Sequence, residues 1–139
     1  MDSMNILVVD DSPIITRKLT MMIELLGYKV VKTAATGMEA VAAYRACRPD
    51  VVTMDITMPD MDGIEATRRI IGEFPDAKIV MVTSHGQEKM VIDALKAGAK
   101  GYVLKPFDGH KVYEAIQKAC KMVVLKDKLR AEAMLRDAQ

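Results

Sequence analysis

The stretch NILVVDD, residues 5–11, places two acids directly after a short run of branched aliphatic residues. A run that is apolar on both faces is typical of a central strand in a parallel sheet. Three further apolar runs each end on a reactive polar residue: VVTM before Asp55, KIVMV before Thr83 and YVL before Lys105. Because carboxyl ends of parallel strands meet at one crevice, we expect three acids, one hydroxyl and one ammonium to converge there.

Strand-like and helix-like patterns alternate about five times along the chain. The strand-like runs are residues 5–9, 29–33, 51–55, 78–82 and 101–104, and helical spacing follows each of them, with the last helix starting near Asp108. Connections this short require right-handed crossovers, with helices on both faces of the sheet. The sequence therefore predicts an α/β fold, a flavodoxin-like doubly wound three-layer sandwich with parallel strand order 2-1-3-4-5.

Composition limits the class of protein. The 139 residues suit one domain, and the net charge of +1 gives no sign of nucleic-acid binding. Cys47 and Cys120 fit neither a disulfide framework nor a metal-ligand spacing, so we expect free thiols in a reducing compartment. No apolar stretch approaches the roughly 18 residues of a membrane span, and the N-terminus lacks a signal-peptide pattern. These features predict a cytoplasmic protein that contacts neither nucleic acid nor membrane.

The predicted strand order brings Asp10 and Asp11 beside Asp55, because the switch point lies between the first and third strands. Carboxylates about 4 to 6 Å apart repel one another by roughly a few kcal/mol per pair, so a cation is needed. Oxygen ligands suit Mg²⁺, with Mn²⁺ as a substitute, better than zinc. Acids at this turn also argue against a nucleotide or flavin phosphate there. The chemistry that fits is an aspartate that accepts a phosphoryl group beside a divalent cation.

Five motifs, in order and at matching spacing, resemble those of two-component response-regulator receiver domains. They are Val9-Asp10-Asp11-Ser12, MDITMPDMDG at residues 54–63, Val82-Thr83-Ser84, Ala97-Gly98-Ala99 and Lys105-Pro106-Phe107. The likeness covers roughly residues 4 to 122, and it is strongest to stand-alone regulators of the chemotaxis type. We therefore expect a receiver domain at residues 1–122 and a helical extension of the last helix at residues 123–139.

The resemblance implies a role for each acid. Asp55 would be the phosphoacceptor, and Asp10 and Asp11 would hold Mg²⁺ together with Asp55 and the backbone carbonyl of Thr57. The implied partners are a histidine kinase, which donates the phosphoryl group, and a protein target that reads the phosphorylated state. The implied activity is limited to self-phosphorylation and autodephosphorylation.

The resemblance also implies roles at the last two strands. Thr83 would hydrogen-bond a phosphoryl oxygen and Lys105 would neutralise its charge. Tyr102 occupies the family's aromatic switch position, and its turning would reshape the face built by the fourth helix, fifth strand and fifth helix. A cis peptide between Lys105 and Pro106 is expected. His85 and Thr57 would flank the route of the hydrolytic water. Two simpler interpretations stay open: Tyr102 is only a packing residue, and His85 is only an exposed loop histidine.

Two alternatives compete with a stand-alone switch. An aspartate-nucleophile phosphohydrolase of the haloacid-dehalogenase type also places an aspartate after a buried strand. That mechanism requires a second acid two residues beyond the nucleophile, and this chain has Thr57 there. The other alternative is a receiver fragment of a larger regulator whose output domain lies outside the chain.

The last helix carries two apolar stripes. One stripe, which should pack on the sheet, comprises Val112, Ile116, Ala119 and Val123; the other, which faces away from the sheet, comprises Met122, Leu125, Leu129 and Ala133. The run LRAEAMLRDA contains no Gly or Pro, so one continuous helix is expected. An isolated extension of about 15 residues is marginal in water, so it should pack on its own domain or on a second copy. The chain is thus expected to be a monomer or a weak homodimer through this helix, with the dimer preferred.

Overall fold

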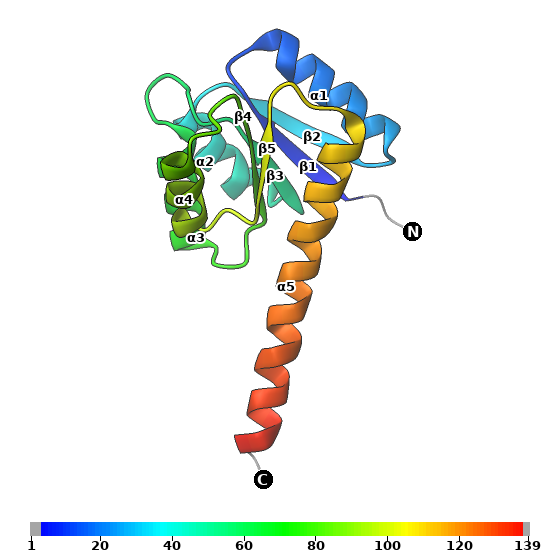
Figure 1. Ribbon diagram of the computed structural model, residues 1–139, viewed down its shortest axis with the longest axis vertical. Coiled ribbons are helices and arrows are strands. Elements are labelled where there is room, and N and C mark those ends of the chain that lie inside the picture. Colours follow the sequence, from blue (N-terminus) through cyan, green and yellow to red (C-terminus); the bar gives the residue numbers. More distant parts are fainter. Residues whose placement is uncertain (1–3, 138–139) are drawn as a thin grey trace.

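Five parallel strands form one sheet in the computed structural model, which describes residues 4–137 and their side chains except those of 122–128, 130, 131 and 137. The strands are β1 (Asn5–Val9), β2 (Lys29–Ala34), β3 (Val51–Met54), β4 (Ile79–Thr83) and β5 (Gly101–Leu104). Their order is β2-β1-β3-β4-β5, with every neighbouring pair parallel (Figure 1). The predicted fold class and strand order are confirmed.

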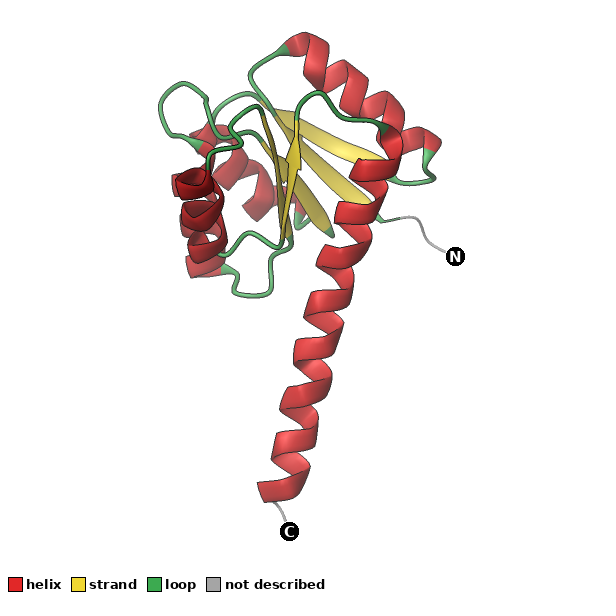
Figure 2. Cartoon of the chain, viewed as in Figure 1, coloured by secondary structure: helices red, strands yellow, loops and turns green. Residues whose placement is uncertain are grey.

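Helices cover both faces of the sheet and complete the three layers (Figure 2). The helices are α1 (Pro13–Leu25), α2 (Gly37–Cys47), α3 (Gly63–Glu73), α4 (Glu88–Ala97) and α5 (Gly109–Asp137). One buried cluster joins the sheet to α2, α3 and α4, and a second joins it to α1 and α5. Central strands are buried on both faces, which explains why their sequences are apolar throughout instead of alternating.

Cap residues mark several helix ends. Ser12 caps α1 by accepting a hydrogen bond from the Ile15 N–H at 3.4 Å. Gly98 ends α4 with a φ of +113°, in the left-handed region that favours glycine. Arg48 ends α2 in the same region, with a φ of +43°, and its guanidinium lies 4.0 Å from the centre of the Phe74 ring. Arg48 precedes a proline, which disfavours continued helix at this position.

The strand register sets which side chains share the carboxyl edge of the sheet. Val9 pairs with both Ala34 and Met54. Hydrogen bonding continues one residue further, because the Asp10 N–H donates to Ala34 and the Asp55 N–H donates to the Val9 carbonyl at 2.9 Å. Asp10 and Asp55 therefore lie side by side just beyond the strand ends.

Helix α5 is a single helix of 29 residues, and its C-terminal half extends beyond the sheet (Figure 1). Val112, Ile116 and Ala119 of the first predicted stripe are buried in its N-terminal half, whereas Leu129 of the second stripe is 54% exposed. The side chains of Val123, Met122 and Leu125 lie outside the described residues. The division into residues 1–122 and 123–139 stays a prediction.

The described helices contain no segment that is both long and apolar enough to cross a membrane.

Candidate functional site

Three carboxylates meet at the carboxyl edge of the sheet, as the strand order predicted. Asp10 and Asp11 follow β1, Asp55 follows β3, and one oxygen from each lies within 4.8 Å of the other two. Asp10 and Asp55 are buried, whereas Asp11 is exposed. The group is therefore open to solvent on the side of Asp11 and closed on the side of the sheet.

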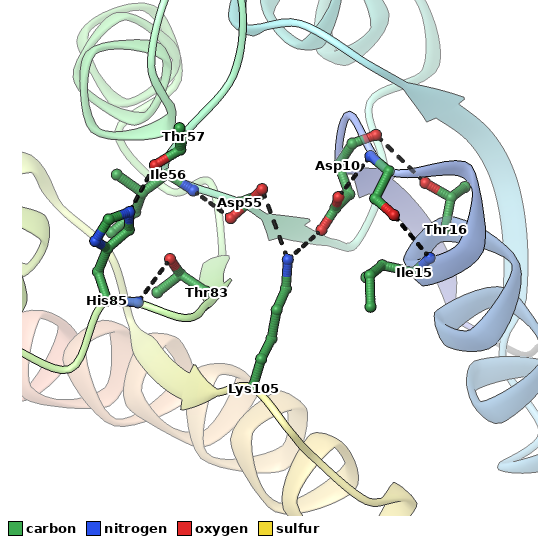
Figure 3. Close-up of polar contacts among 10 residues, drawn as sticks. Asp10, Ile15, Thr16, Asp55, Ile56, Thr57, Thr83, His85 and Lys105 are labelled. Atoms are coloured by element: carbon green, nitrogen blue, oxygen red, sulfur yellow. Dashed lines mark hydrogen bonds and ion pairs between the residues drawn. The ribbon is translucent and has the colours of Figure 1, made fainter.

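Lys105 extends from the end of β5 toward the two buried acids (Figure 3). Its Nζ lies 2.9 Å from Oδ2 of Asp10 and 3.6 Å from Oδ2 of Asp55. The second oxygen of each carboxylate accepts a backbone hydrogen bond, from Ser12 to Asp10 and from Ile56 to Asp55, both at 2.9 Å. These contacts hold both carboxylates in fixed orientations, with the ammonium group between them.

The electrostatics of the site favour a bound cation. Burial raises the pKa of Asp55, and the charge of Asp10 raises it further, while Lys105 and the Ile56 N–H act in the opposite direction. The ionised form of Asp55 is therefore destabilised by burial and by its neighbour, and a divalent cation bound beside it would offset this destabilisation. The three acids supply only oxygen ligands, and this ligand set fits Mg²⁺ or Mn²⁺.

His85 connects the other predicted site residues to one another. Its Nε2 lies 2.6 Å from the Thr57 hydroxyl, and its backbone N–H donates to the hydroxyl of buried Thr83 at 3.3 Å (Figure 3). The Tyr102 hydroxyl donates to the His85 carbonyl. Sequence spacing placed His85 and Thr57 near the site, but their contact joins the β3–α3 loop to the β4–α4 loop and so needs tertiary structure to be seen.

The backbone around the site has two further features. The peptide bond between Lys105 and Pro106 is cis, and the Lys105 N–H donates to the Thr83 carbonyl at 2.8 Å. At the start of α3, a Cβ placed on Gly63 would lie 1.9 Å from the Asp55 carbonyl oxygen. In the sequence, Gly63 stands out only as part of a motif, because nothing local shows how closely its backbone approaches Asp55.

Comparison with known proteins identifies relatives of the chain. Residues 6–117 match the family described as the response regulator receiver domain. The chemotaxis protein CheY of Thermotoga maritima is 46% identical over 116 residues, which cover 84% of this chain and 97% of that protein. CheY of Listeria monocytogenes is 42% identical over 118 residues, which cover 85% of this chain and 99% of that protein.

A solved structure agrees with these matches. The complex of CheX and CheY with BeF3 and Mg²⁺ from Borrelia burgdorferi contains a chain that is 39% identical, with a TM-score of 0.79. The alignment covers 81% of this chain and 86% of that one. Receiver domains are signalling switches and are generally not turnover enzymes. The chain belongs to the family of response regulator receiver domains and is similar to CheY proteins in both sequence and fold.

Proposed function

We propose that this chain is a phosphoacceptor switch of a two-component system and acts in the cytoplasm. Asp55 takes a phosphoryl group from a histidine kinase, and the phosphorylated state controls a protein target. The observation that carries the proposal is the position of the Lys105 ammonium, between the buried carboxylates of Asp10 and Asp55, with Asp11 close enough to share one cation.

The proposed reaction is a direct transfer between two side chains. A carboxylate oxygen of Asp55 attacks the phosphorus of a phosphohistidine, a P–O bond forms and the P–N bond breaks. The electron pair leaves with the imidazole nitrogen, which takes up a proton. Lys105 and the Thr83 hydroxyl stabilise charge on the phosphoryl oxygens.

The proposed cation ligands are Asp10, Asp11, Asp55 and the carbonyl of Thr57. When bound, Mg²⁺ supplies positive charge to the phosphoryl oxygens and removes repulsion among the acids. Mn²⁺ offers the same preference for oxygen ligands and should substitute. The buried acids are already oriented by Ser12 and Ile56, so little rearrangement is needed for them to bind the ion.

The proposed output is a shift in population between two shapes of the face formed by α4, β5 and α5. Thr83 moves toward the phosphoryl group and Tyr102 turns. The support is their shared neighbour, since Thr83 and Tyr102 both hydrogen-bond to the backbone of His85. A cavity of about 420 Å³ lies between β5 and α5 on this face, lined by Tyr102, Leu104 and Lys111 among others.

A protein partner suits this face, because the lining combines apolar and cationic side chains. The Borrelia relative is found in a complex with CheX, so a component of a chemotaxis system is the proposed class of target.

Labelling with acetyl phosphate tests the function. We expect one phosphoryl group per chain, formed only when Mg²⁺ is present, prevented when EDTA is added before the phosphodonor, and released by hydroxylamine, as an acyl phosphate requires. Turnover of p-nitrophenyl phosphate should be negligible. Labelling that forms in the presence of EDTA would contradict the proposed metal-dependent switch, and sustained turnover of p-nitrophenyl phosphate would favour a phosphohydrolase.

A further inference from the structure

Gly37, the first residue of α2, lies against the backbone of a loop that is distant in sequence. A Cβ placed on Gly37 would be 2.3 Å from the Met61 carbonyl oxygen and 2.7 Å from the Met61 Cβ. Real Cβ atoms essentially never approach other heavy atoms within 3.0 Å. Only glycine therefore allows the start of α2 and the β3–α3 loop to lie this close together. Gly37 belongs to none of the motifs that carry the proposed chemistry.

The start of α2 is held firmly in place. The Thr36 hydroxyl accepts a hydrogen bond from the Glu39 N–H at 3.1 Å, and the Glu39 carboxylate accepts one from the Ala35 N–H at 2.8 Å. The first hydrogen bond caps the helix, and the second ties the Glu39 side chain to the residue before the cap, so the first turn of α2 is held at both points. Gly37 is itself buried, and Ala40, one turn further along, is fully buried. An added methyl group at Gly37 would thus displace the loop more easily than the helix.

The β3–α3 loop, residues 57–62, is short and its far end is also fixed. The Gly63 N–H donates to the Ile56 carbonyl at 2.8 Å, and Asp62 caps α3 by accepting from the Glu65 N–H at 2.8 Å. Met61 therefore has little freedom to move alone. A displacement of its backbone is transmitted along the loop to Thr57, which lies two residues after Asp55.

We propose that Gly37 is a positioning residue for the cation site. The start of α2 sets the position of the Met61 backbone, and through the loop it sets the position of the Thr57 carbonyl relative to the three acids. Gly37 does not touch the ion. This inference rests on the proposed function, because it presupposes that Thr57 and the acids bind Mg²⁺.

The test is the Mg²⁺ affinity of Gly37→Ala, measured by titration calorimetry beside the unchanged protein and Gly72→Ala. A Cβ placed on Gly72 meets no atom within 4 Å, so this variant adds the same methyl group to open space. We expect Gly37→Ala to bind Mg²⁺ about tenfold more weakly or worse, as is typical when a group that orients a metal ligand is disturbed. Gly72→Ala should bind like the unchanged protein.

A second readout separates positioning from loss of structure. Labelling of Gly37→Ala by acetyl phosphate should be restored at saturating Mg²⁺, because the acids and Lys105 are intact. Circular dichroism should show a folded protein. If Gly37→Ala does not fold, Thr36→Val replaces it, since this change removes the cap without adding an atom against Met61. Thr36→Val should also weaken Mg²⁺ binding, by a smaller factor.

Asp11→Ala distinguishes failure of this inference from failure of the proposed function. If the unchanged protein and Asp11→Ala have equal Mg²⁺ affinity, the cation site itself is wrong and the inference falls with it. If Asp11→Ala loses affinity while Gly37→Ala, or Thr36→Val in its place, binds like the unchanged protein, only the positioning role is overturned.

Discussion

Asp55 is buried, is oriented by a backbone N–H and lies beside the Lys105 ammonium group, and it shares these features with Asp10. We predict that Asp55→Asn abolishes labelling by acetyl phosphate, because the amide keeps the shape but loses the nucleophile. Stability without metal should not fall, since the change removes a buried charge that Asp10 repels.

Asp60→Asn is the matched control for that variant. Asp60 lies in the β3–α3 loop, five residues after Asp55, and is exposed. Its φ is +69°, a conformation that Asn also tolerates. Asp60→Asn should be labelled by acetyl phosphate like the unchanged protein. Persistent stoichiometric labelling of Asp55→Asn would show that another residue is the phosphoacceptor.

The hydrogen bond between Thr57 and His85 joins two side chains beside the three acids. Thr57→Ala and His85→Ala remove the same contact, so their effects on the decay rate of the phosphorylated protein should not add. The measurement is the loss of label over time in the two single variants and the double variant. Ser84→Ala, at an exposed neighbour, should combine additively with Thr57→Ala. Additive effects of Thr57→Ala and His85→Ala would indicate that the contact does not influence hydrolysis.

The start of helix α3 is packed directly on the backbone of Asp55, the proposed phosphoacceptor. We predict that Gly63→Ala lowers the free energy of unfolding by about 1 to 3 kcal/mol, the usual range for forcing an extra group into a packed site. The reason is the 1.9 Å approach of a Cβ at Gly63 to the Asp55 carbonyl. Denaturant unfolding measures the change.

Gly72→Ala, in the same helix, should act in the opposite direction. Space around Gly72 is open, and alanine is the better helix former by roughly 0.5 to 1 kcal/mol. Equal stability of the two variants would mean that the start of α3 can move away from Asp55 at little cost.

Across the whole molecule, the proposed switch connects the acids to the face formed by α4, β5 and α5. BeF3, an analogue of the phosphoryl group, should shift the amide resonances of Asp55, Thr83, His85 and Tyr102, and those of residues along β5. The path is the pair of hydrogen bonds that Thr83 and Tyr102 make with the backbone of His85. Shifts confined to the acids and absent at Tyr102 would refute this coupling.

The C-terminal half of α5 extends beyond the sheet (Figure 1). Leu129, of the second predicted stripe, is 54% exposed there, so this side chain is not buried against its own domain. We propose that the stripe pairs with a second copy of the chain. Seventeen residues beyond Cys120 span about 25 Å, and a contact of that length lies at the small end of protein interfaces, which favours a weak dimer.

Dimerisation is measured by sedimentation of the intact chain and of a version truncated after Val124. Concentration-dependent dimerisation should appear only in the intact chain. Identical monomeric behaviour of both, with and without phosphorylation, would rule the dimer out.

The sequence determined the layer architecture and which strand ends meet. Short apolar runs separated by helical patterns leave few topologies once right-handed crossovers are required, and the order β2-β1-β3-β4-β5 then brings Asp10 and Asp55 together. The roles of these residues, and of Thr83, Lys105 and Tyr102, stay predictions based on resemblance.

Only the tertiary structure decided how the loops meet. The hydrogen bond between Thr57 and His85 and the approach of Gly37 to Met61 appear in no local pattern. Strand and helix signals depend on periodic side chains within one segment, whereas these features depend on distances between separate segments. Those distances are set by the packing of whole helices on the sheet, and packing is a property of the folded chain.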